Sequence, residues 1–225
     1  MVLSALASLC TATAASAMNH VVLLGDSIFD NAAYVGGGPD VIRQLRSVLP
    51  APWRATLIAR DGAVTAQIQA QLENLPADAS HLALSIGGND ALLQADVLDE
   101  NVPSVGVALD KLAAVRERFL QAYRAMLSDV MNKELPTAVC TIYEARFPDA
   151  DLRRRAAAAL TLLNDCITRE AFARDLTLID LRLICESDGD FANPIEPSSA
   201  GGAKIARAIA QFATGTGART SVIPR

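Results

Sequence analysis

Three short polar motifs, each directly after an apolar run, could together build a site for acyl transfer. Gly25-Asp26-Ser27 follows the run His20–Leu24, Gly62 follows a second apolar run, and Gly87-Gly88-Asn89-Asp90 follows a third. A serine hydroxyl is a nucleophile once a base takes its proton, and backbone N–H groups or an asparagine amide can stabilise the resulting oxyanion. Each motif taken alone could be only a capping or connecting turn. All three together favour serine-dependent hydrolysis of an acyl compound.

The elements around these motifs alternate between strand and helix along the chain. This alternation predicts a three-layer α/β/α sandwich with a five-stranded parallel sheet of flavodoxin-like type, in which working groups gather at the carboxyl ends of the strands. The expected strands are residues 20–24, 54–59, 81–86, 137–143 and 176–183, and the expected helices are residues 40–49, 63–75, 105–130, 151–172 and 200–212.

The three motifs resemble the conserved blocks of the SGNH/GDSL hydrolases, in the family's order and each after an expected strand. Ser27 occupies the position of the nucleophile in the G-D-S block, Gly62 that of the block-two glycine, and Gly87–Asp90 that of the G-x-N-D block. A single tripeptide would be weak support, whereas three blocks in order are specific. The resemblance covers nearly the whole domain and implies the SGNH fold, no cofactor, and an oxyanion hole made of the Ser27 N–H, the Gly62 N–H and the Asn89 amide.

The last block departs from the family's pattern of Asp-x-x-His. The matching segment begins at Asn193 and places Glu196 in the position of the histidine and Asn193 in that of the aspartate. The two histidines of the chain, His20 and His81, start expected strands, at the opposite edge of the sheet from Ser27. A strand of about six residues spans roughly 20 Å, so neither imidazole should reach the serine.

Two interpretations of this departure stay open. In the first, Glu196 is the general base, with its pKa raised by burial from about 4.3 towards the 6.5 of histidine, and Asn193 donates a hydrogen bond to its carboxylate. Asp190, in the same loop, is a reserve candidate for the base. In the second, the protein has lost hydrolase chemistry and its cleft binds a small acyl or carbohydrate-like ligand.

We expect a hydrolase that cleaves an ester or thioester of a small acyl group. Asp26, Asp90 and Arg146 are candidate substrate-binding residues, and the apolar segment Ala91-Leu92-Leu93 together with Phe147 is a candidate acyl pocket. A non-enzymatic scaffold would need a docking surface, and the apolar stripe of residues 105–130 is more typical of a helix packed on a core.

Composition excludes several other classes of function. The net charge is −5, and the densest basic cluster is Arg153-Arg154-Arg155, which is too short for nucleic-acid binding. The four cysteines form no C-x-x-C pair, and no cluster of His, Cys and carboxylates has the spacing of a metal site. We therefore expect a small-molecule ester as substrate, no metal and no nucleic-acid partner; the oligomeric state cannot be inferred from the sequence.

The boundaries divide the chain into one domain and two terminal segments. Residues 1–17 are small and apolar and lack a basic start, and they are expected to be an N-terminal extension, either from a mis-called start upstream of Met18 or a weak signal peptide. This stretch is too short and too rich in Ser and Thr to span a membrane. A domain at residues 18–214 and a tail at residues 215–225 are expected to follow. A cytoplasmic location is expected, or a secreted or periplasmic one if residues 1–17 are a signal peptide.

Overall fold

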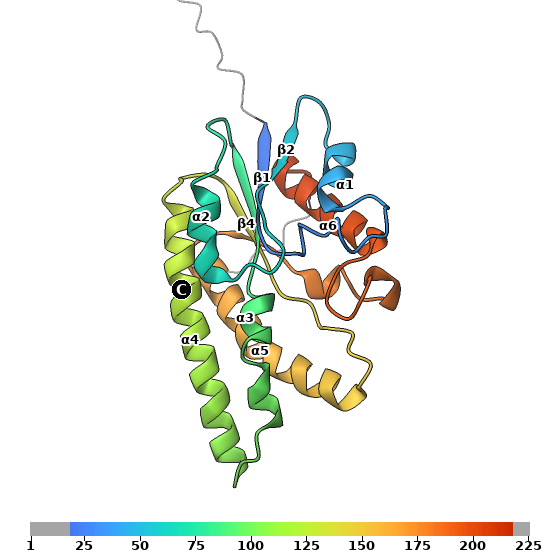
Figure 1. Cartoon of the computed structure of the whole chain (residues 1–225). Helices are drawn as coiled ribbons and strands as arrows, with labels where there is room; N and C mark the ends of the chain where they lie inside the picture. The colour runs from blue at the N-terminus through green and yellow to red at the C-terminus, as the bar shows by residue number, and fades with distance from the viewer. Residues whose placement is uncertain (1–18, 218–225) are drawn as a thin grey trace, which may run out of the picture.

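A parallel sheet of five strands forms the centre of the computed structural model, which describes residues 19–217 (Figure 1). The strands lie in the order β2-β1-β3-β4-β5. The expected α/β fold with a five-stranded parallel sheet is confirmed. The strands are β1 (His20–Gly25), β2 (Arg54–Leu57), β3 (His81–Ser85), β4 (Thr137–Cys140) and β5 (Thr177–Ile179).

The strand order creates a switch point between β1 and β3. From β1 the chain crosses to β2 on one side, and it then returns to β3 on the other side. In open parallel sheets, ligands bind beyond the carboxyl ends of the strands at such a point. Ser27 follows β1 and Asn89 follows β3, so both lie at the position where this rule expects a site.

Alternate residues of β1 belong to two separate hydrophobic cores, as expected for a strand that is buried on both faces. Val22 and Leu24 belong to a core shared with α2 (Ile68–Leu72), α4 (Val105–Met131) and α5 (Ala150–Ala173). Val21 and Leu23 belong to a second core shared with α1 (Val41–Val48) and α6 (Ser199–Thr214). The sheet is thus the middle of three layers.

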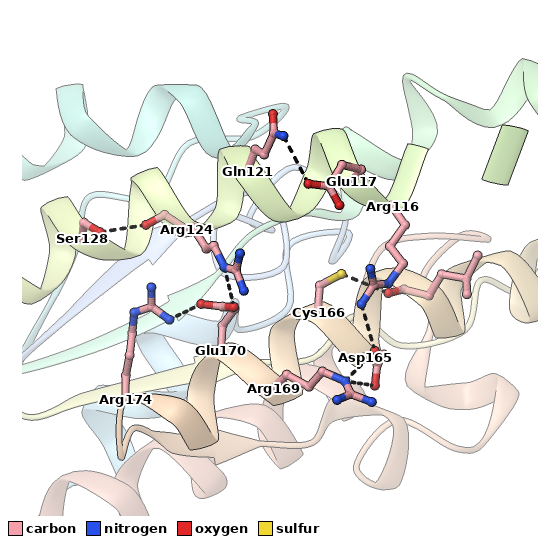
Figure 2. A network of polar contacts seen from close by, with 11 residues as sticks. Arg116, Glu117, Gln121, Arg124, Ser128, Asp165, Cys166, Arg169, Glu170 and Arg174 are labelled. Carbon is pink, nitrogen blue, oxygen red and sulfur yellow. Dashed lines mark hydrogen bonds and ion pairs between the residues drawn. The ribbon is translucent and has the colours of Figure 1, made fainter. Parts of the chain in front are cut away.

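Helices α4 and α5 reach beyond the sheet and are tied together by a network of charged side chains (Figure 2). Glu170 is buried and pairs with Arg124 of α4 at 2.7 Å and with Arg174 of its own helix. Asp165, one turn earlier and more exposed, pairs with Arg169 and contacts Arg116 of α4. These contacts fix how the two longest helices lie against each other.

Two segments differ from the expected helices. The helix expected over residues 63–75 is shorter, with a 3-10 turn at Thr65–Gln67 followed by α2. Residues 88–92, expected in a loop, form the short helix α3 (Gly88–Leu92), which a 3-10 turn at Ala95–Asp99 follows. Among residues 19–217, no helix is both long enough and apolar enough to cross a membrane. The expected N-terminal extension at residues 1–17 and the end of the expected tail, residues 218–225, lie outside the described residues.

Candidate active site

The turn that presents Ser27 depends on a glycine that no other residue could replace. Gly25 ends β1 with a φ of +131°, and a Cβ there would lie 1.8 Å from the carbonyl oxygen of Ser85 on β3. The chain can therefore turn tightly between two strands, and it places Ser27, only 6% exposed, beside a cavity. Beyond this turn, the Asn31 side chain accepts a hydrogen bond from the Val41 N–H and donates one to the Pro197 carbonyl, which links the serine loop to the loop of Glu196.

A buried glutamine holds the backbone just before the nucleophile. The Gln71 amide on α2 accepts a hydrogen bond from the Gly25 N–H at 2.8 Å and donates one to the Gly25 carbonyl at 2.7 Å. Both groups are buried, so the pair satisfies backbone atoms that would otherwise lack partners. Sequence reasoning missed Gln71, because a polar residue on a short helix carries no signal of the backbone it will reach.

Glu196 is held at the site by a tight loop. Phe191 and Pro197 form an antiparallel bridge, and the Ala192 N–H donates to the Glu196 carbonyl at 2.8 Å. The Asn193 side-chain oxygen accepts the N–H groups of Ile195 and Glu196, both at 2.9 Å. Asn193 thus orients the backbone of Glu196; among the described residues it makes no hydrogen bond to the carboxylate, which differs from the expected pairing.

The Glu196 carboxyl lies near Ser27 and is shielded from solvent. The residue is 4% exposed and lines the same cavity as Ser27, and its Oε2 atom has no hydrogen-bond partner among the described residues. Burial raises the pKa of Glu196 to about 7, the hydrogen bond from the Ser27 hydroxyl opposes this rise, and the negative charge of Asp61 adds to it. A carboxyl with this pKa can exchange protons near neutral pH.

The other candidates for the base are occupied or distant. Asp190 forms an ion pair with Lys204 at 2.7 Å, and although burial would raise the pKa of Asp190, Lys204 and the Ser187 N–H hold it below its usual value. His20 and His81 start β1 and β3, at the edge of the sheet opposite Ser27, as expected. His20 contacts Asp78 and Thr56 there.

The three expected oxyanion donors follow β1, β2 and β3 in turn along the chain. The N–H groups of Ser27 and Gly62 have no hydrogen-bond partner among the described residues, and Gly62 has a φ of +77°. The Asn89 amide donates one hydrogen to the Ala63 carbonyl at 2.9 Å. An amide carries two hydrogens, so the second is available for a substrate. Asn89 lines the cavity, whereas Gly62 is exposed and is not among the lining residues.

The three expected substrate-binding residues differ in position. Asp26 lines the cavity and is buried; burial raises its pKa to about 8, opposed by the Ile28 N–H and reinforced by Glu196 and Asp90. Asp90 does not line the cavity, and its carboxylate accepts hydrogen bonds from the Thr65 N–H and, at 2.6 Å, from the Thr65 hydroxyl. Asp90 therefore links α3 to the segment after Gly62. This contact is structural, whereas a substrate-binding role was expected.

Arg146 lies behind the loop of Glu196 instead of in the cavity. Its backbone N–H donates to the Pro194 carbonyl at 2.7 Å, and its guanidinium donates to the Glu186 carbonyl and lies over the Phe191 ring. The nearby Tyr143 hydroxyl donates to the Ile195 carbonyl at 2.7 Å. The segment after β4 thus supports the loop that carries Glu196, and the expected contact of Arg146 with substrate does not fit this position.

A largely apolar cavity of about 400 Å³ opens beside Ser27 and Glu196. Ala91, Leu92 and Phe147 line it as expected, whereas Leu93 is 72% exposed and is not among the lining residues. Sequence reasoning missed the walls that α4 and α5 supply, because their apolar residues were expected in the core. These walls include Leu112, Val115, Leu152, Ala156, Ala159 and Leu163.

Comparisons with known proteins show which family the sequence matches. The family model of the GDSL-like lipase/acylhydrolase family matches residues 23–204, which is most of the chain. No curated protein matches.

Several solved structures are similar in fold. An extracellular lipase from Streptomyces rimosus has 19% sequence identity and a TM-score of 0.61, over 85% of this chain and 98% of the lipase. A phospholipase A1 from Streptomyces albidoflavus has 17% identity and a TM-score of 0.63, over 85% and 98% of the two chains. An aryl esterase from M. smegmatis has 14% identity and a TM-score of 0.61, over 88% and 99%. The chain belongs to the GDSL-like lipase/acylhydrolase family, whose members are hydrolases of ester bonds.

Proposed function

We propose that this protein hydrolyses carboxylic esters or thioesters through Ser27, with Glu196 as the general base. The observation that carries the proposal is the Glu196 carboxyl, which is buried beside Ser27 and has a pKa raised to about 7. The sequence resemblance, which aligns Glu196 with the family's histidine, supports the same role. An ordinary exposed glutamate would be too weak a base to share the serine proton. Burial in the loop of residues 191–197 supplies the missing basicity.

The proposed reaction follows from this arrangement. Glu196 takes the hydroxyl proton of Ser27 while the Ser27 Oγ atom attacks the substrate carbonyl carbon. The N–H groups of Ser27 and Gly62 and the free hydrogen of the Asn89 amide stabilise the oxyanion. When the intermediate collapses, the bond to the leaving alcohol or thiol breaks, and the protonated Glu196 returns the proton to it. Water then repeats the sequence on the acyl-serine and releases the acid.

The pH dependence of hydrolysis tests the role of Glu196. We would measure kcat/KM for p-nitrophenyl butyrate from pH 5 to 9 with the wild type, Ser27→Ala, Glu196→Gln and Asp188→Asn, the last as a control because Asp188 is 90% exposed in the same region. The wild type should gain activity as the pH rises through about 7, because only the ionised carboxylate accepts the proton. Ser27→Ala and Glu196→Gln should each lose about 100-fold or more, and Asp188→Asn should keep the wild-type profile.

Other outcomes lead elsewhere. If the wild type is no faster than Ser27→Ala at every pH, the serine mechanism is wrong, and the cleft is better explained as a binding site for an acyl or carbohydrate-like ligand. If Ser27→Ala is inactive but the kcat/KM of Glu196→Gln still rises through about pH 7 as in the wild type, another group is the base. A double variant, Glu196→His with Asn193→Asp, would restore the family's own pair and should be active if the loop holds the expected geometry.

A further inference from the structure

We propose that the cavity beside Ser27 binds the hydrocarbon chain of a medium or long acyl group, on the order of ten carbons, instead of the small acyl group expected from the sequence. This inference rests on the proposed function and names its substrate class. A methylene group takes up roughly the volume of one water molecule, about 30 Å³. A cavity of about 400 Å³ therefore accommodates a chain of this length, whereas an acetyl group would leave most of the space unfilled.

The walls of the cavity match an alkyl chain and little else. Beyond the polar groups next to Ser27, the side chains come from α3 and the segment after it, from α4 and from α5, and most are Ala, Leu or Val. Because Ala, Leu and Val predominate in these walls, most hydroxyls of a sugar would lack partners there, which costs free energy. Small residues of α5, Ala156 and Ala159, leave room between larger leucines.

The space exists because α4 and α5 continue past the carboxyl edge of the sheet (Figure 1). The segment 93–104, between α3 and α4, closes the third side. It is tied to both long helices by polar contacts: Gln94 accepts from Arg118, Glu100 pairs with Lys111, and Asp99 lies 3.6 Å from Arg155. The cavity is thus built by three elements; Gln94, Asp96 and Asp99 also line it, and most of the other lining residues that these elements supply are apolar.

The charge around Glu196 decides which half of an ester occupies the cavity. Glu196 must return its proton to the leaving alcohol, so the alcohol leaves on the side that Glu196 faces. Beside Glu196 lie polar groups near the surface: Asp61, which raises the pKa of Glu196, and Tyr34, whose hydroxyl donates to Asp61 at 2.7 Å. This polar surface suits the alcohol, and the apolar part of the cavity, which neither Asp61 nor Tyr34 lines, is left for the acyl chain.

A series of p-nitrophenyl esters from acetate to palmitate, used below their micelle concentrations, measures the length of chain that the cavity accepts. Burial of one methylene group corresponds to about a fourfold gain in kcat/KM. The wild type should gain about this factor per methylene and then level off near ten carbons. A kcat/KM that falls beyond butyrate would overturn the proposal.

A matched pair of variants on α5 tests where the chain lies. Ala156 is half-buried and lines the cavity, whereas Ala158 is exposed and does not. Ala156→Phe should lower kcat/KM on decanoate at least tenfold more than on acetate, and Ala158→Phe should match the wild type on both. Equal chain-length profiles for the two variants would contradict the proposed location. In n-alkyl acetates the alcohol carries the hydrocarbon chain instead of the acyl group. If kcat/KM rises with chain length as steeply for these esters as for the p-nitrophenyl esters, the assignment of the cavity to the acyl chain is wrong.

A binding measurement separates this inference from the proposed function. Ser27→Ala should bind decanoic acid, measured by calorimetry, with an affinity that Ala156→Phe weakens at least tenfold and Ala158→Phe leaves unchanged. If binding follows this pattern while the wild type hydrolyses nothing, the cavity assignment holds and the hydrolase mechanism fails. If the wild type hydrolyses acetate but Ser27→Ala does not bind decanoic acid, the mechanism holds and the cavity assignment fails.

Discussion

Glu196 combines a fixed backbone with a buried side chain. Its backbone is fixed by Asn193, and its side chain lies in a desolvated place next to Ser27. Burial normally disfavours a charged carboxylate, and here that cost is what raises the pKa towards neutrality. The neutral side chain of Asn193 fits this arrangement, because a second carboxylate at that position would add like-charge repulsion.

Asn89 is the side-chain donor that we expect to carry most of the transition-state stabilisation. Asn89→Ala should lower kcat by about 100- to 1,000-fold and change KM little, since the oxyanion forms only after attack. Steady-state kinetics on p-nitrophenyl butyrate measure the two constants separately. Because Asn89 also bonds the Ala63 carbonyl, a thermal melt of the variant must show the wild-type fold. A rise in KM with unchanged kcat would show that Asn89 binds the ground state instead.

Gln71 should matter to stability and catalysis together, because it pairs both backbone groups of Gly25 in a buried place. Gln71→Leu leaves these groups without partners and should lower the free energy of unfolding by about 1–3 kcal/mol. The same change should lower kcat, since Gly25 is two residues before Ser27. Urea unfolding and steady-state kinetics measure these effects, and Gln69→Leu is the control, because Gln69 lies on the same helix and is exposed. Equal losses in the two variants would show that Gly25 does not need this partner.

Single residues differ in how far the sequence predicts them. Ser27, Asn89 and Glu196 could be named because each lies at a fixed place in a motif, and in the structure all three line the same cavity. Asp90 and Arg146 were expected to bind substrate, since a charged residue near a site has no visible partner in a sequence. In the fold they bind Thr65 and the loop of Glu196.

At the scale of elements, the strands could be predicted and the short helices could not. Buried parallel strands are near-continuous apolar runs, and all five expected strands are present, although four of them end earlier than expected. The segment Gly88–Leu92 begins with glycine and asparagine, which are poor helix formers, so a loop was expected. Asp90 overrides this local preference, because its bonds to Thr65 fix the segment from outside.

The contact between α4 and α5 should depend on one buried carboxylate. The side chain of Glu170 is 5% exposed and that of Asp165 is 41% exposed, and each pairs with arginines (Figure 2). Glu170→Gln leaves Arg124 and Arg174 without their shared counter-charge and should lower the free energy of unfolding by about 2–3 kcal/mol. Asp165→Asn should cost less than about 1 kcal/mol, because exposed ion pairs contribute little. Urea unfolding of the two variants tests the difference; equal losses would mean that burial does not set the strength of this network.

The molecule as a whole should become less stable as the pH rises above neutrality, because two carboxyls are buried at one site. Burial raises the pKa of Glu196 to about 7 and that of Asp26 to about 8, so the folded protein holds protons that the unfolded chain has released. A group with a raised pKa contributes its full stability below its unfolded pKa and loses it as the pH rises through the folded pKa. The pKa values of His20 and His81 are lowered, mainly by burial. Their contribution to the pH dependence of stability is therefore confined to pH values below about 6.5.

The window from pH 6.5 to 8.5 therefore isolates the two carboxyls. Across it, the free energy of unfolding of the wild type should fall by about 1–3 kcal/mol, measured by urea unfolding in buffers of equal ionic strength. Glu196→Gln and Asp26→Asn should each reduce this fall, and the double variant should remove most of it and be more stable than the wild type at pH 8.5. A gain in stability at the expense of hydrolysis would show that the Glu196 carboxyl is kept for its reaction and not for the fold. A wild type with constant stability across this window would mean that the site is solvated, and the case for Glu196 as a base near neutral pH would fail with it.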